Sequence, residues 1–178
     1  MGHKHSKDDI LQGALDAVFD DGLSQLTFGR LAKRLGISDR IIVYYFPTKD
    51  DLITEVMGAV GLQLQLTLAE AFTAPASDHL ELARTAWPVL AHPDADAVFA
   101  LFFEANGLAA AGREPYRRVV TALVGAWVQW LATFFEGRPA ARRAESEAAI
   151  ALLDGLLLVR QLAGPEAADR AAARLGVA

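Results

Sequence analysis

The chain has 178 residues, of which 53% are hydrophobic, and a formal net charge of −5. This length suits one ordinary domain or a small domain joined to a larger one, and the apolar content excludes a disordered chain. Because there is no cysteine, disulfides, thiolate metal sites and cysteine nucleophiles are excluded. The histidines show no metal-ligand spacing, so we expect no metal and no cofactor.

Positive charge is concentrated in one N-terminal segment. Residues 27–49 hold five basic side chains and one acidic side chain, whereas residues 51–178 hold ten basic and fifteen acidic ones. A small basic segment on an acidic body is typical of a DNA-binding domain joined to a domain that does not contact DNA. A solvated basic surface gives the same pattern, so charge alone leaves both interpretations open.

The N-terminus is polar and lacks the apolar segment of a signal peptide, so we expect a cytoplasmic protein. Residues 119–135 carry no charge over 17 residues, which is the lower limit for a helix that crosses a bilayer. They also include Thr121, Gln129 and Thr133. We therefore expect a buried helix here and no association with a membrane.

Hydrophobic periodicity predicts helices along the whole chain. The expected helices span residues 7–21, 27–35, 38–46, 48–72, 78–91, 94–111, 115–136, 140–163 and 166–175. Thr27, Ser38 and Thr48 each stand where a hydroxyl can cap the first turn of a helix. Pro88 lies inside a periodic segment, so we expect a kink or break there. No segment alternates with period two over a useful length, so we predict an all-α fold without a sheet.

Residues 27–46 have the pattern of a helix-turn-helix. Two short helices are joined by Gly36 and Ile37, and apolar residues stand wherever a three-helix core needs them. These core positions are Leu31, Leu35, Ile37, Ile42 and Phe46. In this motif the second helix enters the major groove of DNA. Taken alone the pattern is weak, because any two short helices around a glycine can produce it.

The longer segment LTFGRLAKRLGISDRIIVYYFPTKDDLI, residues 26–53, resembles the DNA-binding signature of the TetR (tetracycline repressor) family. The matching positions are Thr27, Leu31-Ala32, Gly36-Ile37-Ser38, Tyr45-Phe46, Thr48-Lys49-Asp50 and Leu52. The resemblance covers about residues 8–57. Beyond them it extends only to architecture, with a long apolar helix around Asp154-Gly155-Leu156-Leu157. Gly29, Arg40 and Val43 depart from the usual residues of the family, so its operators cannot be transferred to this chain.

The resemblance implies a two-part, all-α architecture. Residues 1–47 are expected to form a three-helix DNA-binding domain, and residues 48–178 a helical domain for ligand binding and dimerisation. The implied function is ligand-responsive transcriptional regulation, in which a small apolar effector releases a repressor from a palindromic operator. An activator of the same family and a helical interaction protein that does not bind DNA are the alternatives. Because no catalytic triad, paired-carboxylate motif or phosphate-binding loop is present, we do not expect an enzyme.

Seven residues are candidates for contacting DNA. The resemblance implies phosphate contacts by Tyr45 and Lys49, and Thr27 at a helix N-terminus is a third phosphate candidate. Tyr45 could instead be a core aromatic residue, and Lys49 an ordinary surface charge. Contacts to bases are expected from Ser38, Arg40, Val43 and Tyr44. Arg40 can form two hydrogen bonds to a guanine, and Val43 can contact a thymine methyl group.

Two segments, 115–136 and 140–163, are apolar around more than one face. A helix with one apolar stripe needs one partner, whereas these two helices need two partners each. We expect each helix to pack on its own core and on a second copy of the chain. The result is a homodimer, as the resemblance also implies, whose two recognition helices lie about 34 Å apart.

The candidate ligand residues are apolar, with one exception. Phe99, Phe103 and Asn106 share one face of the segment 94–111. A lone polar group on an aromatic face is typical of ligand pockets, but Asn106 could equally form a hydrogen bond between helices. Trp87, Trp127 and Trp130 are further candidates, although tryptophans at helical spacing are more often core residues. These residues favour an apolar or aromatic effector.

Overall fold

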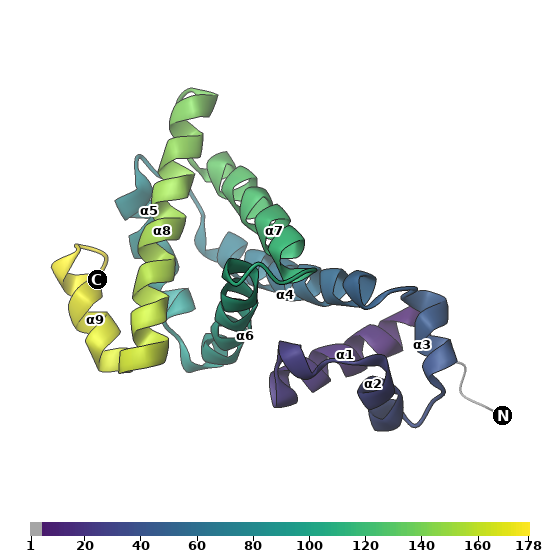
Figure 1. Cartoon of the computed structure of the whole chain (residues 1–178). Coiled ribbons are helices and arrows are strands. Elements are labelled where there is room, and N and C mark those ends of the chain that lie inside the picture. The colour runs from purple at the N-terminus through teal and green to yellow at the C-terminus, as the bar shows by residue number, and fades with distance from the viewer. Residues whose placement is uncertain (1–4) are drawn as a thin grey trace.

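A computed structural model gives the structure of residues 5–178. The N-terminal helices α1 (Lys7–Asp21), α2 (Phe28–Leu35) and α3 (Asp39–Tyr45) lie together, and α4 (Lys49–Ala71) runs from them into the larger part of the molecule (Figure 1). The larger part consists of α5 (His79–Leu90), α6 (Pro93–Ala110), α7 (Tyr116–Leu131), α8 (Pro139–Ala163) and α9 (Pro165–Arg174). Hereafter α1 to α3 are called the head, and α5 to α9 the body.

The predicted all-α fold is confirmed. Each helix expected from periodicity is present within a few residues of its expected ends, and residues 5–178 contain no strand beyond an isolated bridge between Ala76 and Phe135. The largest difference is at the end of α7. That helix stops at Leu131 because residues 132–134 tighten into the 3-10 turn η2 (Ala132–Phe134).

Of the kink or break expected at Pro88, the break is wrong. Helix α5 continues through Pro88 to Leu90, and the N–H of Ala91 still donates to the carbonyl of Trp87 over 2.8 Å. The missing N–H of Pro88 leaves one helical hydrogen bond unmade, but only Val89 and Leu90 follow it in α5, so little regular structure is disturbed. Trp87 and Leu90 are 4% exposed, so their packing holds this last turn in place.

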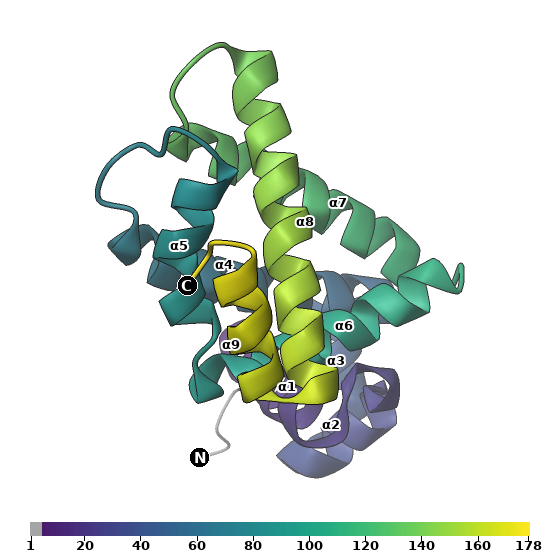
Figure 2. The ribbon, with the colours of Figure 1, turned by 90° about the vertical axis from the view of Figure 1, so that its left-hand side faces the viewer.

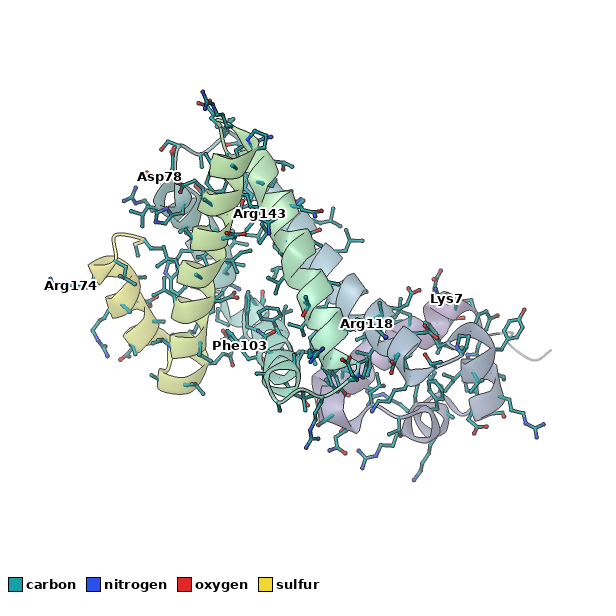
Figure 3. The ribbon with its side chains drawn as sticks, turned by 45° about the horizontal axis from the view of Figure 1, so that its top comes forward. Lys7, Asp78, Phe103, Arg118, Arg143 and Arg174 are labelled. Atoms are coloured by element: carbon teal, nitrogen blue, oxygen red, sulfur yellow. The ribbon has the colours of Figure 1, made fainter. Side chains whose placement is uncertain are left out.

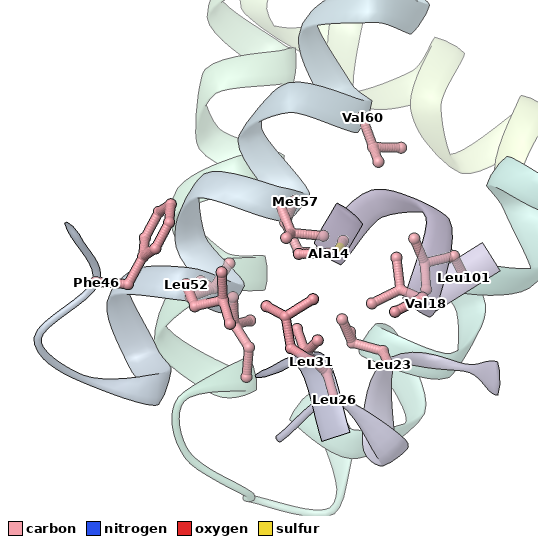
Figure 4. Packing of buried hydrophobic residues seen from close by; sticks show 14 of the residues in the cluster. Ala14, Val18, Leu23, Leu26, Leu31, Phe46, Leu52, Met57, Val60 and Leu101 are labelled. Atoms are coloured by element: carbon pink, nitrogen blue, oxygen red, sulfur yellow. The ribbon is translucent and has the colours of Figure 1, made fainter. Parts of the chain in front are cut away.

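Helix α4 contributes to both hydrophobic clusters of the molecule. Its first half carries Leu52, Met57 and Val60, which pack with Ala14 of α1 and Leu101 of α6 in the first cluster (Figure 4). Its second half carries Leu68, which belongs to a second cluster built from α5 to α9. The packing around α4 therefore connects the head directly with the body.

Helix α4 is also the one helix in residues 5–178 whose length and hydropathy would suffice to cross a membrane. Its first turns belong to the core, since Leu52, Ile53 and Val56 are fully buried, whereas Leu62 and Leu66 further along are exposed. The uncharged segment 119–135 is divided between α7, η2 and the extended residue Phe135 that follows them.

Helix α8 lies along the body between α9, α5 and α7 (Figure 2). It is attached to the first turn of α6 by an ion pair in which Nε of Arg160 lies 2.6 Å from Oδ1 of Asp96, and Nη2 lies 3.0 Å from Oδ2. The Arg160 side chain is 6% exposed. A buried guanidinium needs a charged partner, and a carboxylate that accepts two parallel hydrogen bonds also fixes its orientation. This pair therefore fixes where α8 crosses α6.

Glu104 of α6 connects the body with the turn that follows α1. Its carboxylate accepts the N–H groups of Leu23 and Ser24, each over 2.8 Å. Burial raises the pKa of Glu104, but the backbone donors of Ser24 and Leu23 lower it by more, so the net pKa lies below the ordinary 4.5. A carboxyl with a lowered pKa stabilises the fold above its unfolded pKa, and this stabilisation is lost as the pH falls through the folded pKa.

We expect Glu104→Ala to reduce the free energy of unfolding by about 1 kcal/mol at pH 7, since two backbone donors lose a charged acceptor at a partly exposed site. Urea unfolding at pH 7 and pH 3 measures the effect, which should be smaller at pH 3. Glu70→Ala, at an exposed position of α4, is the control. A loss of equal size at both pH values would show that the charge of Glu104 is not what matters.

Candidate nucleic-acid interface and apolar cavity

The turn between α2 and α3 depends on Gly36. This residue has φ 66° and ψ 31°, a left-handed conformation that costs glycine little and other residues more. The N–H of Ile37 donates to the carbonyl of Ala32 over 3.0 Å, which completes the end of α2. Leu31 of α2 and Ile42 of α3 are then buried against each other's helices. The turn therefore sets how α3 is presented on the surface of the head.

Helix α3 has one buried face and one exposed face. Ile42 and the following Phe46 are 0% and 1% exposed, whereas Tyr44 is 78% exposed and Val43 is 42% exposed. Ser38 and Arg40 are also exposed. Four side chains proposed to contact bases thus lie at or near the N-terminal part and outer face of one short, well-anchored helix.

Several positive charges of the head and of the start of α4 are not neutralised within residues 5–178. Lys7 pairs with Glu55, and Arg34 pairs with Asp20. Lys33, Arg40 and Lys49 form no ion pair or hydrogen bond through their side chains within residues 5–178. Unpaired cations can each neutralise a phosphate without first breaking an internal pair. Lys33 is not among the candidates predicted from the sequence. The sequence does not show which basic side chains of α2 are paired, and only the structure shows that Arg34 pairs with Asp20 while Lys33 has no such partner.

The hydroxyl candidates are already hydrogen-bonded. Thr27 Oγ1 accepts the N–H of Arg30 over 3.2 Å, and Ser38 Oγ accepts the N–H of Arg40 over 3.3 Å, so both residues cap helices. Tyr45 is half-buried, and its hydroxyl donates to the carbonyl of His5 over 3.2 Å. Its ring meets that of Tyr44 edge to face, with centroids 4.9 Å apart. Tyr45 therefore supports Tyr44 whether or not it also contacts a phosphate.

The start of α4 is fixed from two sides. Thr48 and Asp51 form a capping box, with the N–H of Asp51 donating to Thr48 Oγ1 over 3.1 Å. Arg118, labelled at the start of α7 in Figure 3, pairs with Asp50, Nη2 to Oδ2, over 3.1 Å. Lys49, between these residues, is half-buried. A lysine held in this way presents its charge from a defined position next to the head.

The body contains an apolar cavity of about 80 Å³ that is partly open to solvent. Helices α4 to α8 all contribute to its wall, through aliphatic and aromatic residues with one charged exception. Met57 and Val60 of α4 line the cavity and also belong to the first hydrophobic cluster. An apolar wall with a single charged group is typical of a site for a small organic molecule.

The ligand candidates from the sequence divide into two groups. Phe99 and Trp127 line the cavity. The residues that do not line it are Trp87, Phe103, Asn106 and Trp130. Trp87 is 4% exposed in the second cluster, and Trp130 packs against Trp127 with ring centroids 5.2 Å apart. Oδ1 of Asn106 is buried without a hydrogen-bond partner in residues 5–178, so the hydrogen bond between helices considered for that oxygen is not formed.

Asp154 is the charged residue in the cavity wall, and its carboxylate has no hydrogen bond or ion pair within residues 5–178. Burial raises its pKa from 3.8 to about 6. The sequence places Asp154 in the last long apolar helix but does not predict it as a ligand-binding residue. The available signal was its position as the one charge between Glu147 and Arg160.

Comparisons with known proteins agree on the head. Residues 10–56 match the model of bacterial regulatory proteins of the tetR family. A segment of 48 residues is 42% identical to the HTH-type transcriptional regulator BetI 1 of Chromohalobacter salexigens, and it covers 27% of this chain and 24% of that protein. The match thus spans about a quarter of the length of this curated relative.

Solved structures resemble the whole chain. A transcriptional regulator from Rhodococcus sp. Rha1 is 19% identical with a TM-score of 0.72, over 97% of this chain and 94% of that one. The multidrug binding protein EbrR, solved in complex with imidazole, is 23% identical with a TM-score of 0.68, over 97% of this chain and 96% of that one. At these identities the likeness shows that head and body together have the fold of such regulators.

Proposed function

We propose that this chain, whose residues 10–56 match the model of bacterial regulatory proteins of the tetR family, is a cytoplasmic, ligand-responsive repressor that binds a palindromic operator as a homodimer. The family and these relatives are regulators and not enzymes. The observation that carries the proposal is α3, which is anchored on a buried face and exposes Arg40 and Tyr44. We assign DNA binding to residues 1–47, and ligand binding and dimerisation to residues 48–178.

The route from ligand to DNA is proposed to pass through α4. Met57 and Val60 touch both the cavity and the packing around α1, so a ligand that displaces them also disturbs the head. A ligand that binds better to one spacing of the two heads shifts the population toward that spacing. EbrR is a multidrug binding protein, and its fold supports the assignment of the cavity as the effector site.

Dimerisation is proposed to bury an exposed stripe of α8. Small or apolar side chains follow one another at alternating spacings of three and four residues along this face. They are the half-buried Ala148 and the exposed Ala151, Gly155, Leu158 and Leu162. Leu162 is 80% exposed and Leu158 is 41% exposed. Such a stripe is the seam of a helix that packs against another helix, and small residues in it allow close approach.

We expect light scattering at micromolar concentration to give about twice the chain mass of 19.1 kDa. Leu158→Arg should shift the mass toward that of one chain, because it buries an unpaired charge in the interface. Leu175→Arg, which alters an exposed leucine outside α8, is the matched control and should remain dimeric. A wild-type chain that is monomeric under these conditions would contradict both the dimer and the palindromic operator.

The proposed function is tested by selecting bound sequences from a random pool of DNA duplexes at fixed, moderate salt. Enrichment of a short inverted repeat is the expected result, since a two-fold dimer carries two copies of α3. No enrichment over background would contradict operator binding and would favour a helical interaction protein.

Lys49→Ala is expected to weaken binding to every duplex and to flatten the dependence of affinity on salt. One lost phosphate contact lowers the slope of log K against log salt by about 0.9. Titrations at several salt concentrations measure this slope. Arg174→Ala removes one positive charge at the far end of the molecule from the head (Figure 3) and should leave the slope unchanged. An unchanged slope for Lys49→Ala would remove its phosphate role, and Tyr45→Phe tests Tyr45 in the same way.

A further inference from the structure

We propose that the effector of this protein is an apolar cation whose positive group lies beside Asp154. The inference rests on the proposed function, because it names the class of molecule that the cavity binds. It concerns one residue of α8 and the walls that face it from four other helices.

The electrostatics of the cavity are set by a single group. Asp154 is the one charged residue among those that line it, and the wall residues from α4, α5, α6 and α7 include no titratable side chain. Within residues 5–178 the Asp154 carboxylate forms no hydrogen bond and no ion pair. The cavity therefore holds an acceptor whose charge no part of the described chain neutralises.

A carboxylate in such surroundings favours a positively charged occupant. Removal from water penalises the charged form, which is why burial raises the pKa of Asp154 to about 6. Near neutral pH the group is still mostly ionised, so a cation placed beside it recovers the lost solvation. An anion would be repelled, and a neutral molecule without a hydrogen-bond donor would leave the carboxylate without a partner.

The walls suit the rest of such a molecule. Phe72, Phe99, Phe102 and Trp127 line the cavity, and the faces of aromatic rings attract cations. The neighbouring positions of α8 that line it, Ile150, Leu153 and Leu157, are aliphatic. A ligand with one positive group and an apolar or aromatic body can thus satisfy Asp154 and bury its own hydrocarbon surface.

The test compares two probes of nearly the same shape by calorimetry, on the full chain without DNA at pH 7.5. Benzyltrimethylammonium carries a permanent charge, and neopentylbenzene is its neutral carbon isostere. We expect the cation to bind at least 10-fold more tightly than the isostere, and Asp154→Asn to lose about that factor for the cation alone. Glu147→Gln removes the same charge from α8 outside the cavity and should bind the cation like the wild type.

A pH series separates the carboxylate from general packing. The charge of benzyltrimethylammonium does not change with pH, so its affinity follows the ionisation of Asp154. With a pKa of about 6, affinity should fall by about 10-fold between pH 7.5 and pH 5. Asp154→Asn should show no such fall, while binding of neopentylbenzene shows that the variant retains a folded cavity.

Equal binding of the cation by wild type and Asp154→Asn, or no binding at millimolar cation, would overturn the proposal. Operator binding is measured separately, on the duplex selected from the random pool. If the operator is bound but the cation is not, the cationic effector fails and DNA regulation stands. If the cation binds through Asp154 without changing operator affinity, the site stands and its regulatory role fails.

Discussion

Replacing Arg40 by alanine is expected to lower affinity for the selected operator by about 10- to 100-fold, with little change for an unrelated duplex. Arg40 is exposed on α3 and has no internal ion pair to break. A guanidinium that forms two hydrogen bonds to a guanine contributes about 1–3 kcal/mol of discrimination. Fluorescence anisotropy with the operator and a shuffled duplex, at one fixed salt concentration, measures both affinities.

Arg34→Ala is the matched control for this change. Arg34 lies on α2 and is already paired with Asp20. Arg34→Ala should therefore lower the affinity for the selected operator by less than Arg40→Ala does. Equal losses on operator and shuffled duplex for Arg40→Ala would mean that Arg40 contacts a phosphate and that bases are read elsewhere, with exposed Tyr44 as the next candidate.

Asp154→Asn is expected to raise the free energy of unfolding by about 2 kcal/mol at pH 8, after allowance for partial exposure. The folded pKa of about 6 lies above the ordinary 3.8. The native state therefore binds the proton more tightly than the unfolded state does. This contribution to stability is complete below pH 3.8 and is lost as the pH rises through 6.

Asparagine mimics the protonated carboxyl, so its advantage should vanish near pH 4. Urea unfolding of wild type and variant at pH 4 and pH 8, without ligand, tests this sign, with Glu147→Gln as the control. A variant that is less stable than the wild type at pH 8 would mean that the ionised carboxylate already has a stabilising partner, such as one in a second copy of the chain. We expect the carboxylate of Asp154 to gain a stabilising partner only when the cationic ligand binds.

The head could be predicted from sequence almost completely, because its elements are set by local chemistry. Thr27, Ser38 and Thr48 cap their helices as expected, and Gly36 adopts the left-handed conformation that ends α2. These effects depend on residues only a few positions apart. Ion pairs between helices are not set by neighbouring residues in this way. Arg34 of α2 pairs with Asp20 of α1, so the sequence alone does not show that Arg34 is paired and that its neighbour Lys33 is not.

The cavity could be predicted only in part, because its wall is assembled from five helices. Phe99 and Trp127 were found because they are large and apolar, but Phe103, Asn106 and Trp130, on the same two helices, do not line it. Helical periodicity identifies an apolar face without saying whether that face meets a neighbour or an empty space. Asp154 was missed because a single acidic residue in an apolar helix gains meaning only when its surroundings are known.

The central claim is that a dimer of this chain recognises a specific operator through α3. The most direct measurement is the ratio of affinities for the selected inverted repeat and for a shuffled duplex of equal length, with the number of chains bound to each repeat. We predict two chains per repeat and a ratio of about 10³ or more. Equal affinity for the two duplexes at the same salt concentration would contradict specific recognition by α3.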